Sequence, residues 1–148
     1  MRQRIGAGGL VLRDGRLLCV RTRYGTSSLW IPPGGKIEPG EDALLTAVRE
    51  TWEEAGVRAR AIKVAIVQDL PTPQGHLCKY WVLCEDLGGE PHVGGLERAE
   101  RGRIRKAAFV DRERAIRDGA VGLLKDDRFW QGVENGFREM MYFGRNTG

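Results

Sequence analysis

The segment from Asp42 to Ala55 constrains the fold of this chain more than any other. Side chains suited to packing recur in it at the 3.6-residue spacing of an α-helix and make one face. These residues are Leu44, Ala47, Val48, Thr51 and Ala55. Gly56 follows at the position where a helix C-cap is expected. We therefore predict a helix over Asp42–Ala55 that packs one side against the rest of the fold.

Strands and further helices surround this helix in the sequence. Apolar runs separated by turn signals at Asp14-Gly15 and Pro71–Gly75 predict strands. The predicted strands are Ile5–Leu12, Leu17–Val20, Trp30-Ile31, Ala61–Leu70, Leu77–Cys84 and Ile104–Val110. Further helices are expected over 111–118 and 129–141, a break over 32–35, and a long loop over 85–102. This order predicts an α/β (α+β) fold in which helices cover a sheet.

Length and composition limit the class of protein. With 148 residues, we expect one domain over 1–148 that has its own core. No apolar run is long enough to cross a bilayer or to act as a secretion signal, so we expect a cytoplasmic protein with no membrane partner. Three cysteines without a C-x-x-C pair, Cys19, Cys78 and Cys84, favour buried thiols over a disulfide framework or a zinc site.

The charge of the chain favours an anionic partner. The net charge is +4, and residues 97–117 hold eight basic side chains against four acidic ones. A basic surface attracts nucleotides and nucleic acids. Because the excess is moderate and local, we interpret this segment as solvated surface, with a nucleic-acid groove as the alternative.

Three carboxylates lie together on the predicted helix. Glu50, Glu53 and Glu54 follow i, i+3, i+4 spacing, which places them on one side. Like charges at this spacing destabilise a helix by roughly 0.2–0.5 kcal/mol per pair. A divalent cation would offset that repulsion, and carboxylate oxygens suit Mg²⁺ or, as an alternative, Mn²⁺. A solvated acidic face neutralised by Arg49 and Arg58 is the other interpretation.

The loop before the helix favours the metal site. Residues 32–35, Pro-Pro-Gly-Gly, make a rigid turn in which the backbone can approach a ligand closely. A carbonyl from this turn could add an oxygen ligand beside the carboxylates. The turn and the acidic side of the helix together indicate a metal site more specifically than either feature does alone.

Residues 35–57 resemble a known family. Gly35, five residues, Glu41, seven residues and then Arg49-Glu50-Thr51-Trp52-Glu53-Glu54-Ala55-Gly56-Val57 are similar to a complete Nudix box. Thr51 stands where the family usually has an aliphatic residue, and its place on the packing face predicts burial. The lead-in over 30–41 resembles the MutT-like branch.

This resemblance implies a Nudix α/β/α sandwich with a mixed β-sheet, and hydrolysis of a nucleoside diphosphate linked to another group X. It implies that Glu53, Glu54 and the Gly34 carbonyl bind the metal. Glu50 would be a further ligand or the base. Arg49 would orient the glutamates, and Glu41 would support them from behind.

Charge explains the expected mechanism. A diphosphate repels nucleophiles, so metal ions would neutralise its oxygens and lower the pKa of the attacking water. A carboxylate then takes the proton, a step worth roughly 10²–10⁴-fold. Glu54 and Glu50 are the candidate bases. Glu97 and Glu100 in the long loop are candidates for an extra ligand or base, with surface acids as the alternative.

The substrate is less constrained than the reaction. We predict a small (deoxy)nucleoside triphosphate rather than a nucleic-acid chain. ADP-ribose or a nucleotide sugar is one alternative, since Pro73 lies where ADP-ribose-cleaving members often carry proline, although it also suits a turn. An RNA 5′-end is another alternative. Arg21 and Arg23 are candidate phosphate contacts or a basic strand edge, and Trp30 could stack on a base or pack in the core.

A non-catalytic Nudix-fold regulator that binds nucleotide or nucleic acid is the third class. Degenerate binders usually lose box glutamates, whereas this chain keeps all of them, which favours an enzyme. The oligomeric state is left open, a homodimer included.

Overall fold

The computed structural model describes residues 2–93 and 103–145. In chain order the elements are β1 (Arg2–Arg13), β2 (Arg16–Tyr24), β3 (Ser27–Ile31), β4 (Gly34–Lys36), α1 (Ala43–Ala55), β5 (Arg58–Thr72), β6 (Gly75–Gly88), β7 (Ile104–Val110), α2 (Arg112–Asp118), the 3₁₀ turn η1 (Gly122–Lys125), α3 (Asp127–Asn135) and β8 (Met141–Gly144).

The strands form one mixed sheet. Its order is β3-β2-β1-β6-β5-β8, with β4 paired to β1 and β7 paired to β2. The β1–β6 and β5–β8 pairs are parallel, and the others are antiparallel. The predicted α+β class with a mixed sheet is confirmed.

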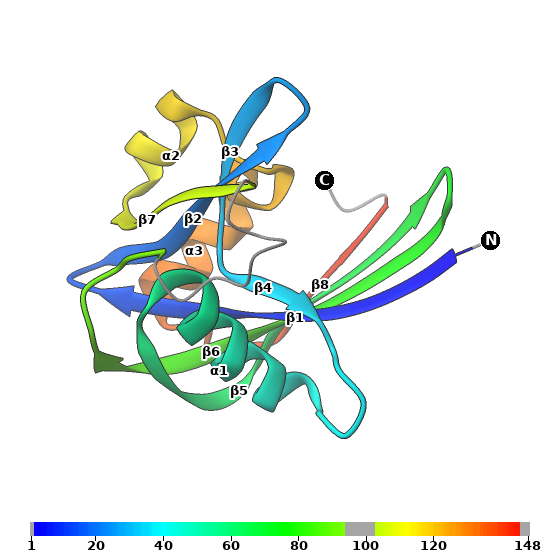
Figure 1. Ribbon diagram of the computed structural model, residues 1–148, viewed down its shortest axis with the longest axis horizontal. Coiled ribbons are helices and arrows are strands. Elements are labelled where there is room, and N and C mark those ends of the chain that lie inside the picture. Colours follow the sequence, from blue (N-terminus) through cyan, green and yellow to red (C-terminus); the bar gives the residue numbers. More distant parts are fainter. Residues whose placement is uncertain (1, 94–102, 146–148) are drawn as a thin grey trace.

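The core lies on both sides of this sheet (Figure 1). Neighbouring residues of one strand belong to different clusters, as Leu10 and Val11 do, because successive side chains point to opposite faces. Helix α1 contributes Ala47 and Ala55 to one cluster. Helix α3 contributes Phe129 and Trp130 to the other cluster. Helices therefore cover both faces, as in the predicted sandwich.

Helix α1 begins and ends where the sequence predicted. The Asp42 carboxylate caps it by accepting from the Leu45 backbone N–H at 2.9 Å, and Gly56 ends it with a φ of 71°. Thr51 is fully buried, and its hydroxyl donates to the Ala47 carbonyl at 2.7 Å. Gly9 of β1 lies directly beneath Thr51, where a Cβ would clash with the hydroxyl. The helix thus packs closely on β1, and the predicted burial of Thr51 is confirmed.

The helix predicted over 129–141 is present but shorter than expected. Helix α3 ends at Asn135, and Gly136 follows in the left-handed region. The buried Phe137 then turns back, so that its ring lies 5.7 Å from that of Phe129 and fills the space beside Gly132. The chain next forms β8, parallel to β5. Packing of Phe137 against the helix therefore ends it earlier than its periodicity suggested.

Two loops also differ from expectation. Residues 34–36, placed partly in the predicted break, form β4 because they pair with Gly6–Gly8 of β1. Strand β6 continues to Gly88, which shortens the predicted loop. Glu97 and Glu100 lie outside the described residues.

Cys19 and Cys84 are buried as predicted, whereas Cys78 is partly exposed, and all three are free thiols.

Within residues 2–93 and 103–145, no helix is long and apolar enough to cross a membrane.

Candidate active site

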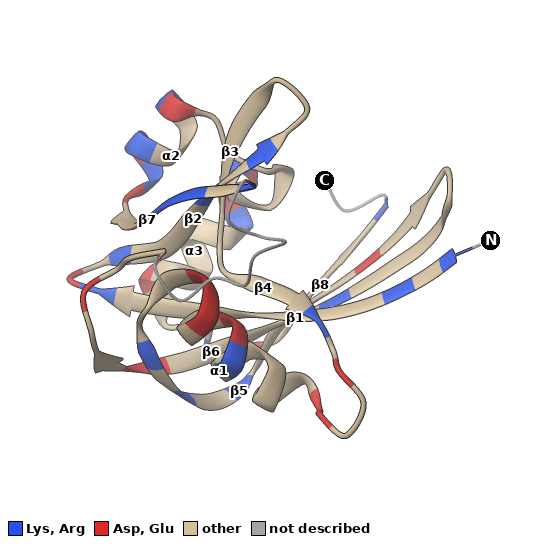
Figure 2. Ribbon diagram, in the orientation of Figure 1, with Lys and Arg blue, Asp and Glu red and all other residues tan. Residues whose placement is uncertain are grey.

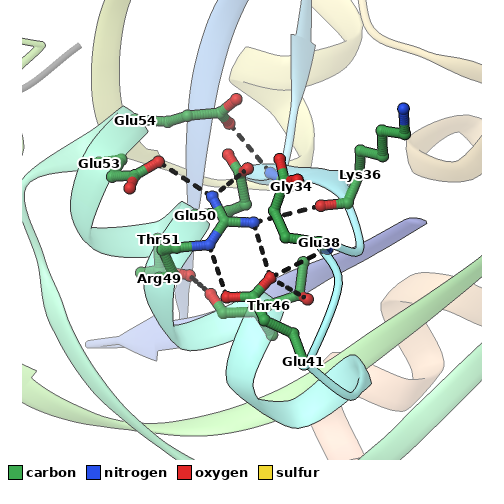
Figure 3. Close-up of polar contacts among 11 residues, drawn as sticks. Gly34, Lys36, Glu38, Glu41, Thr46, Arg49, Glu50, Thr51, Glu53 and Glu54 are labelled. Atoms are coloured by element: carbon green, nitrogen blue, oxygen red, sulfur yellow. Dashed lines mark hydrogen bonds and ion pairs between the residues drawn. The ribbon is translucent and has the colours of Figure 1, made fainter. Parts of the chain in front are cut away.

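Arg49 of α1 organises the predicted carboxylate cluster (Figure 3). Its Nε and Nη2 donate to the two oxygens of Glu41 at 2.7 and 2.9 Å. Its Nη1 donates to Glu50 at 2.8 Å and to Glu53 at 3.1 Å. Nη2 also donates to the Lys36 carbonyl at 3.2 Å. These contacts use all five guanidinium hydrogens, a pattern that lysine cannot reproduce.

Glu41 holds Arg49 from the loop before α1. Besides Arg49, its carboxylate accepts from the Thr46 hydroxyl at 2.9 Å and from the Glu38 backbone N–H at 3.1 Å. These donors, the Arg49 guanidinium above all, lower the pKa of Glu41 to about 2. The same contacts raise the pKa of Arg49. Glu41 and Arg49 are thus a fixed ion pair at neutral pH, which fits the supporting role that the resemblance implies.

Glu50 and Glu54 are the buried members of the carboxylate cluster. Their exposed fractions are 5% and 2%, although both are carboxylates. Glu54 accepts from the Gly34 backbone N–H at 2.9 Å, so β4 and α1 meet at this side chain. Both glutamates and Gly34 line one end of a cavity of about 1100 Å³. Two buried carboxylates beside each other concentrate negative charge, which fits a cationic ligand in addition to the Arg49 contact of Glu50.

Gly35 makes this close approach feasible. A Cβ at Gly35 would lie 2.6 Å from Glu50 Oε1. Any side chain at this position would therefore push the glutamate away from the turn. This contact gives a physical reason for the glycine that opens the box.

The oxygen donors at this end of the cavity fit Mg²⁺. In the part of the chain that the structure describes, no three acidic, histidine or cysteine side chains converge on one point. Arg49 draws Glu50 and Glu53 to itself through the same Nη1. Mg²⁺ commonly needs only one or two protein carboxylates, with water and substrate phosphates as its other ligands. Glu50 and Glu54 could supply that pair.

Glu53 differs from its two neighbours. It bonds to Arg49, its side chain is 29% exposed, and it is not part of the cavity wall. The structure thus brings Glu50, Glu54 and Gly34 together at the cavity, with Arg49, Glu41 and Glu53 behind them. The metal role of Glu53 remains a prediction, as do the roles of Glu97 and Glu100.

The predicted substrate contacts lie elsewhere. Trp30 is 1% exposed, and its indole N–H donates to Asp118 at 3.2 Å. Arg21 donates to the carbonyls of Asp118 and Gly119, and Arg23 is exposed on the same strand. None of the three predicted residues lines the cavity. For Trp30, the alternative of core packing is therefore the one that the structure supports.

Other cavity residues were missed by the sequence interpretation. They come from β1, β2, β5, β6, β8 and the start of α3, segments far apart in the chain. They include Arg4, Tyr24, Gln68, Lys79, Asp126, Arg128 and Phe143. Lys79 alone had a local signal, because it is the single charged residue in the apolar run from Leu77 to Cys84.

Fold and site together define a class of protein. In this class a mixed sheet lies between helices, and an arginine binds a carboxylate cluster at the end of a cavity. The NUDIX domain family model matches residues 2–129. The chain belongs to the Nudix family.

Individual relatives match over shorter stretches. The NAD-capped RNA hydrolase NudC of Chromobacterium violaceum is 33% identical over 92 residues, which cover 61% of this chain and 34% of that protein. The human nucleoside diphosphate-linked moiety X motif 6 protein is 32% identical over 84 residues, 54% of this chain and 27% of that protein. The chain therefore spans about a third or less of the length of these relatives.

Solved structures match over nearly the whole chain. A Nudix hydrolase from Nitrosomonas europaea superposes with a TM-score of 0.75 at 16% identity, over 94% of this chain and 93% of that chain. A MutT Nudix hydrolase from Burkholderia pseudomallei has a TM-score of 0.65 at 25% identity, over 90% and 98%. The similarity to the first structure shows the fold alone.

Proposed function

We propose that this chain is a Mg²⁺-dependent pyrophosphohydrolase that cleaves a phosphoanhydride bond in a nucleoside diphosphate linked to X. We further propose that its substrate is a small (deoxy)nucleoside triphosphate. The observation that carries the proposal is the burial of Glu50 and Glu54 beside Gly34, at one end of a cavity large enough for a nucleotide.

The protein's residues have distinct tasks in this proposal. Glu54 and Glu50, with the Gly34 carbonyl and Glu53, would hold Mg²⁺, which when bound supplies positive charge to the phosphates and acidifies the attacking water. Glu54 or Glu50 accepts the proton of that water. Arg49 keeps the carboxylates in place through its five donors. The Glu41 ion pair fixes Arg49 in turn.

A panel of substrates tests this proposal. Nucleoside triphosphates, ADP-ribose and nucleotide sugars are incubated with Mg²⁺. Phosphate release is measured with and without added pyrophosphatase for the triphosphates, and with added alkaline phosphatase for ADP-ribose and the nucleotide sugars, whose products are phosphomonoesters. We expect the highest kcat/KM for a nucleoside triphosphate, with phosphate detected only after pyrophosphatase is added. Faster cleavage of ADP-ribose or a nucleotide sugar would overturn the substrate. No cleavage of any compound, with intact folding, would overturn the activity.

A second candidate substrate is the 5′-end of RNA. One observation favours it: Arg2, Arg4 and Arg103 line the same cavity as the carboxylates. A nucleic-acid ligand that releases about six counterions loses roughly 10³-fold in affinity between about 50 and 200 mM salt. We expect kcat/KM for a nucleoside triphosphate to change far less over this range. More efficient turnover of a 5′-triphosphorylated RNA, with the steep salt dependence, would make RNA the substrate.

A further inference from the structure

Lys79 is a charged residue in an unusual place. It lies in the middle of β6, paired with Gly6 of β1 on one side and Gln68 of β5 on the other. The neighbouring strands and side chains bury much of its stem, yet the residue lines the cavity. Lysine is rarely placed in such surroundings, because burial disfavours its charge. A position of this kind calls for a specific anionic partner.

The wall around Lys79 is rigid. Its Nζ lies 4.4 Å from the centroid of the Trp81 ring, a cation–π distance. Trp81 is itself buried, and its indole N–H donates to Gln68 at 2.6 Å. On its other side the lysine stem packs on Gly34, where a Cβ would lie 3.1 Å from Lys79 Cε. The ammonium is therefore held next to the turn whose backbone N–H binds Glu54.

Charges of both signs meet at this point. Burial lowers the pKa of Lys79, and the carboxylates of Glu54 and Glu50 oppose that shift. Arg103, another cavity residue, adds a second positive charge nearby. Glu50 already accepts from Arg49, and Glu54 from Gly34. A substrate phosphate that approaches the carboxylates with its metal would thus meet a cation held beside them.

We propose that Lys79 binds a non-bridging oxygen of the substrate's diphosphate group at the carboxylate end of the cavity. The inference rests on the proposed function only in that the ligand is a diphosphate. A buried, charge-assisted hydrogen bond to an oxyanion supplies both affinity and orientation. Lys79 is accordingly a binding residue, distinct from the carboxylates that handle metal and proton.

Binding of methylenediphosphonate, a diphosphate that cannot be hydrolysed, tests this role by isothermal calorimetry in Mg²⁺. Lys79→Met should weaken binding by roughly ten- to hundredfold, because the oxyanion loses a charged partner. Lys79→Arg should restore it to within about threefold of the wild type. Lys106→Met removes the same charge from an exposed site on β7 and should bind like the wild type.

A Lys79→Met protein that folds and binds the diphosphonate like the wild type would overturn the proposal. A fall in its affinity for Mg²⁺ alone would also overturn it, since Lys79 would then act through the metal site. Loss of a cation beside carboxylates should instead leave Mg²⁺ affinity unchanged or raise it. If Lys79→Met does not fold, Lys79→Gln replaces it in the same titrations.

Kinetics with a substrate that is cleaved should also separate the binding role of Lys79 from the chemical role of the carboxylates. KM should rise roughly tenfold in Lys79→Met, with kcat within about threefold, because the contact exists before the transition state. Diphosphonate binding needs no turnover. If no nucleotide is cleaved but diphosphonate binding depends on Lys79, only the proposed activity is overturned. If nucleotides are cleaved but diphosphonate binding does not depend on Lys79, only the role of Lys79 is overturned.

Discussion

Two sets of charged cavity residues, with their neighbours, are built in different ways. The carboxylate end (Gly34, Gly35, Glu50, Glu54) comes from one continuous stretch of β4 and α1, and local hydrogen bonds join its parts. The cationic wall (Arg4, Lys79, Arg103, Arg128) comes from β1, β6, the residue before β7, and α3. Figure 2 shows acidic residues along α1, and basic residues spread over several strands. Short spacing in the sequence therefore encodes the carboxylate end, whereas sheet topology assembles the cationic wall.

This difference predicts different sensitivities. Changes at the carboxylate end should affect chemistry and local stability together, because the same side chains do both. Changes in the cationic wall should affect substrate binding and selectivity.

The largest effect is expected for Glu54→Gln. Glu54 is buried at the cavity and is held by Gly34, so its loss removes a ligand or base from the centre of the site. We expect kcat to fall roughly 10²–10⁴-fold with folding intact. Glu53→Gln is the matched comparison: the resemblance predicts a large loss there too, and its partial exposure predicts a smaller one than for Glu54.

Steady-state kinetics in saturating Mg²⁺ and circular dichroism make this measurement. A folded Glu54→Gln protein with near-normal turnover would refute the site. A larger loss in Glu53→Gln than in Glu54→Gln would reverse the division between the two glutamates.

The next effect is expected for Arg49→Lys. Lysine keeps the charge but cannot serve Glu41, Glu50, Glu53 and the Lys36 carbonyl at once. The buried Glu50 loses the hydrogen bond from Arg49, so the free energy of unfolding should fall by about 1–3 kcal/mol. Displaced carboxylates should lower kcat by roughly 10²-fold.

Urea denaturation and kinetics test this expectation. Arg60→Lys is the matched control, because Arg60 pairs with Glu85 on the surface and such pairs contribute only about 0–1 kcal/mol. Equal effects of the two substitutions would show that the Arg49 network has no special role.

A smaller effect concerns acid stability. Arg49 and the other donors lower the pKa of Glu41 from an ordinary 4.5 to about 2 in the folded protein. The ionised form therefore stabilises the fold fully above pH 4.5, and this contribution disappears as the pH falls towards 2. Glu41→Gln lacks the titrating group, so its free energy of unfolding should fall less steeply over this window than that of the wild type. Parallel pH profiles for the two proteins would contradict the assigned ion pair.

Local spacing determined much of this protein. Helix α1, its caps at Asp42 and Gly56, and the burial of Thr51 follow from a period of 3.6 residues and from capping chemistry. The clustering of Arg49 with the three box glutamates was predictable for the same reason, whereas the place of Glu41 behind them was implied by the family resemblance. Strand β7 and helix α2 also lie where their patterns placed them. In each case the interacting residues are close in sequence, so the pattern itself carries the information.

Only the tertiary structure decided the rest. Trp30 lies in the core because β2 pairs with its strand and Asp118 at the end of α2 accepts from its indole N–H. Helix α3 ends early because Phe137 packs against it, and Lys79 reaches the carboxylate end because β6 lies parallel to β1. The positions of Trp30 and Lys79 depend on contacts between residues far apart in the chain, and the end of α3 depends on side-chain packing that its periodicity does not contain. Strand pairing and packing select such contacts by total buried area and register, which no short window of sequence contains.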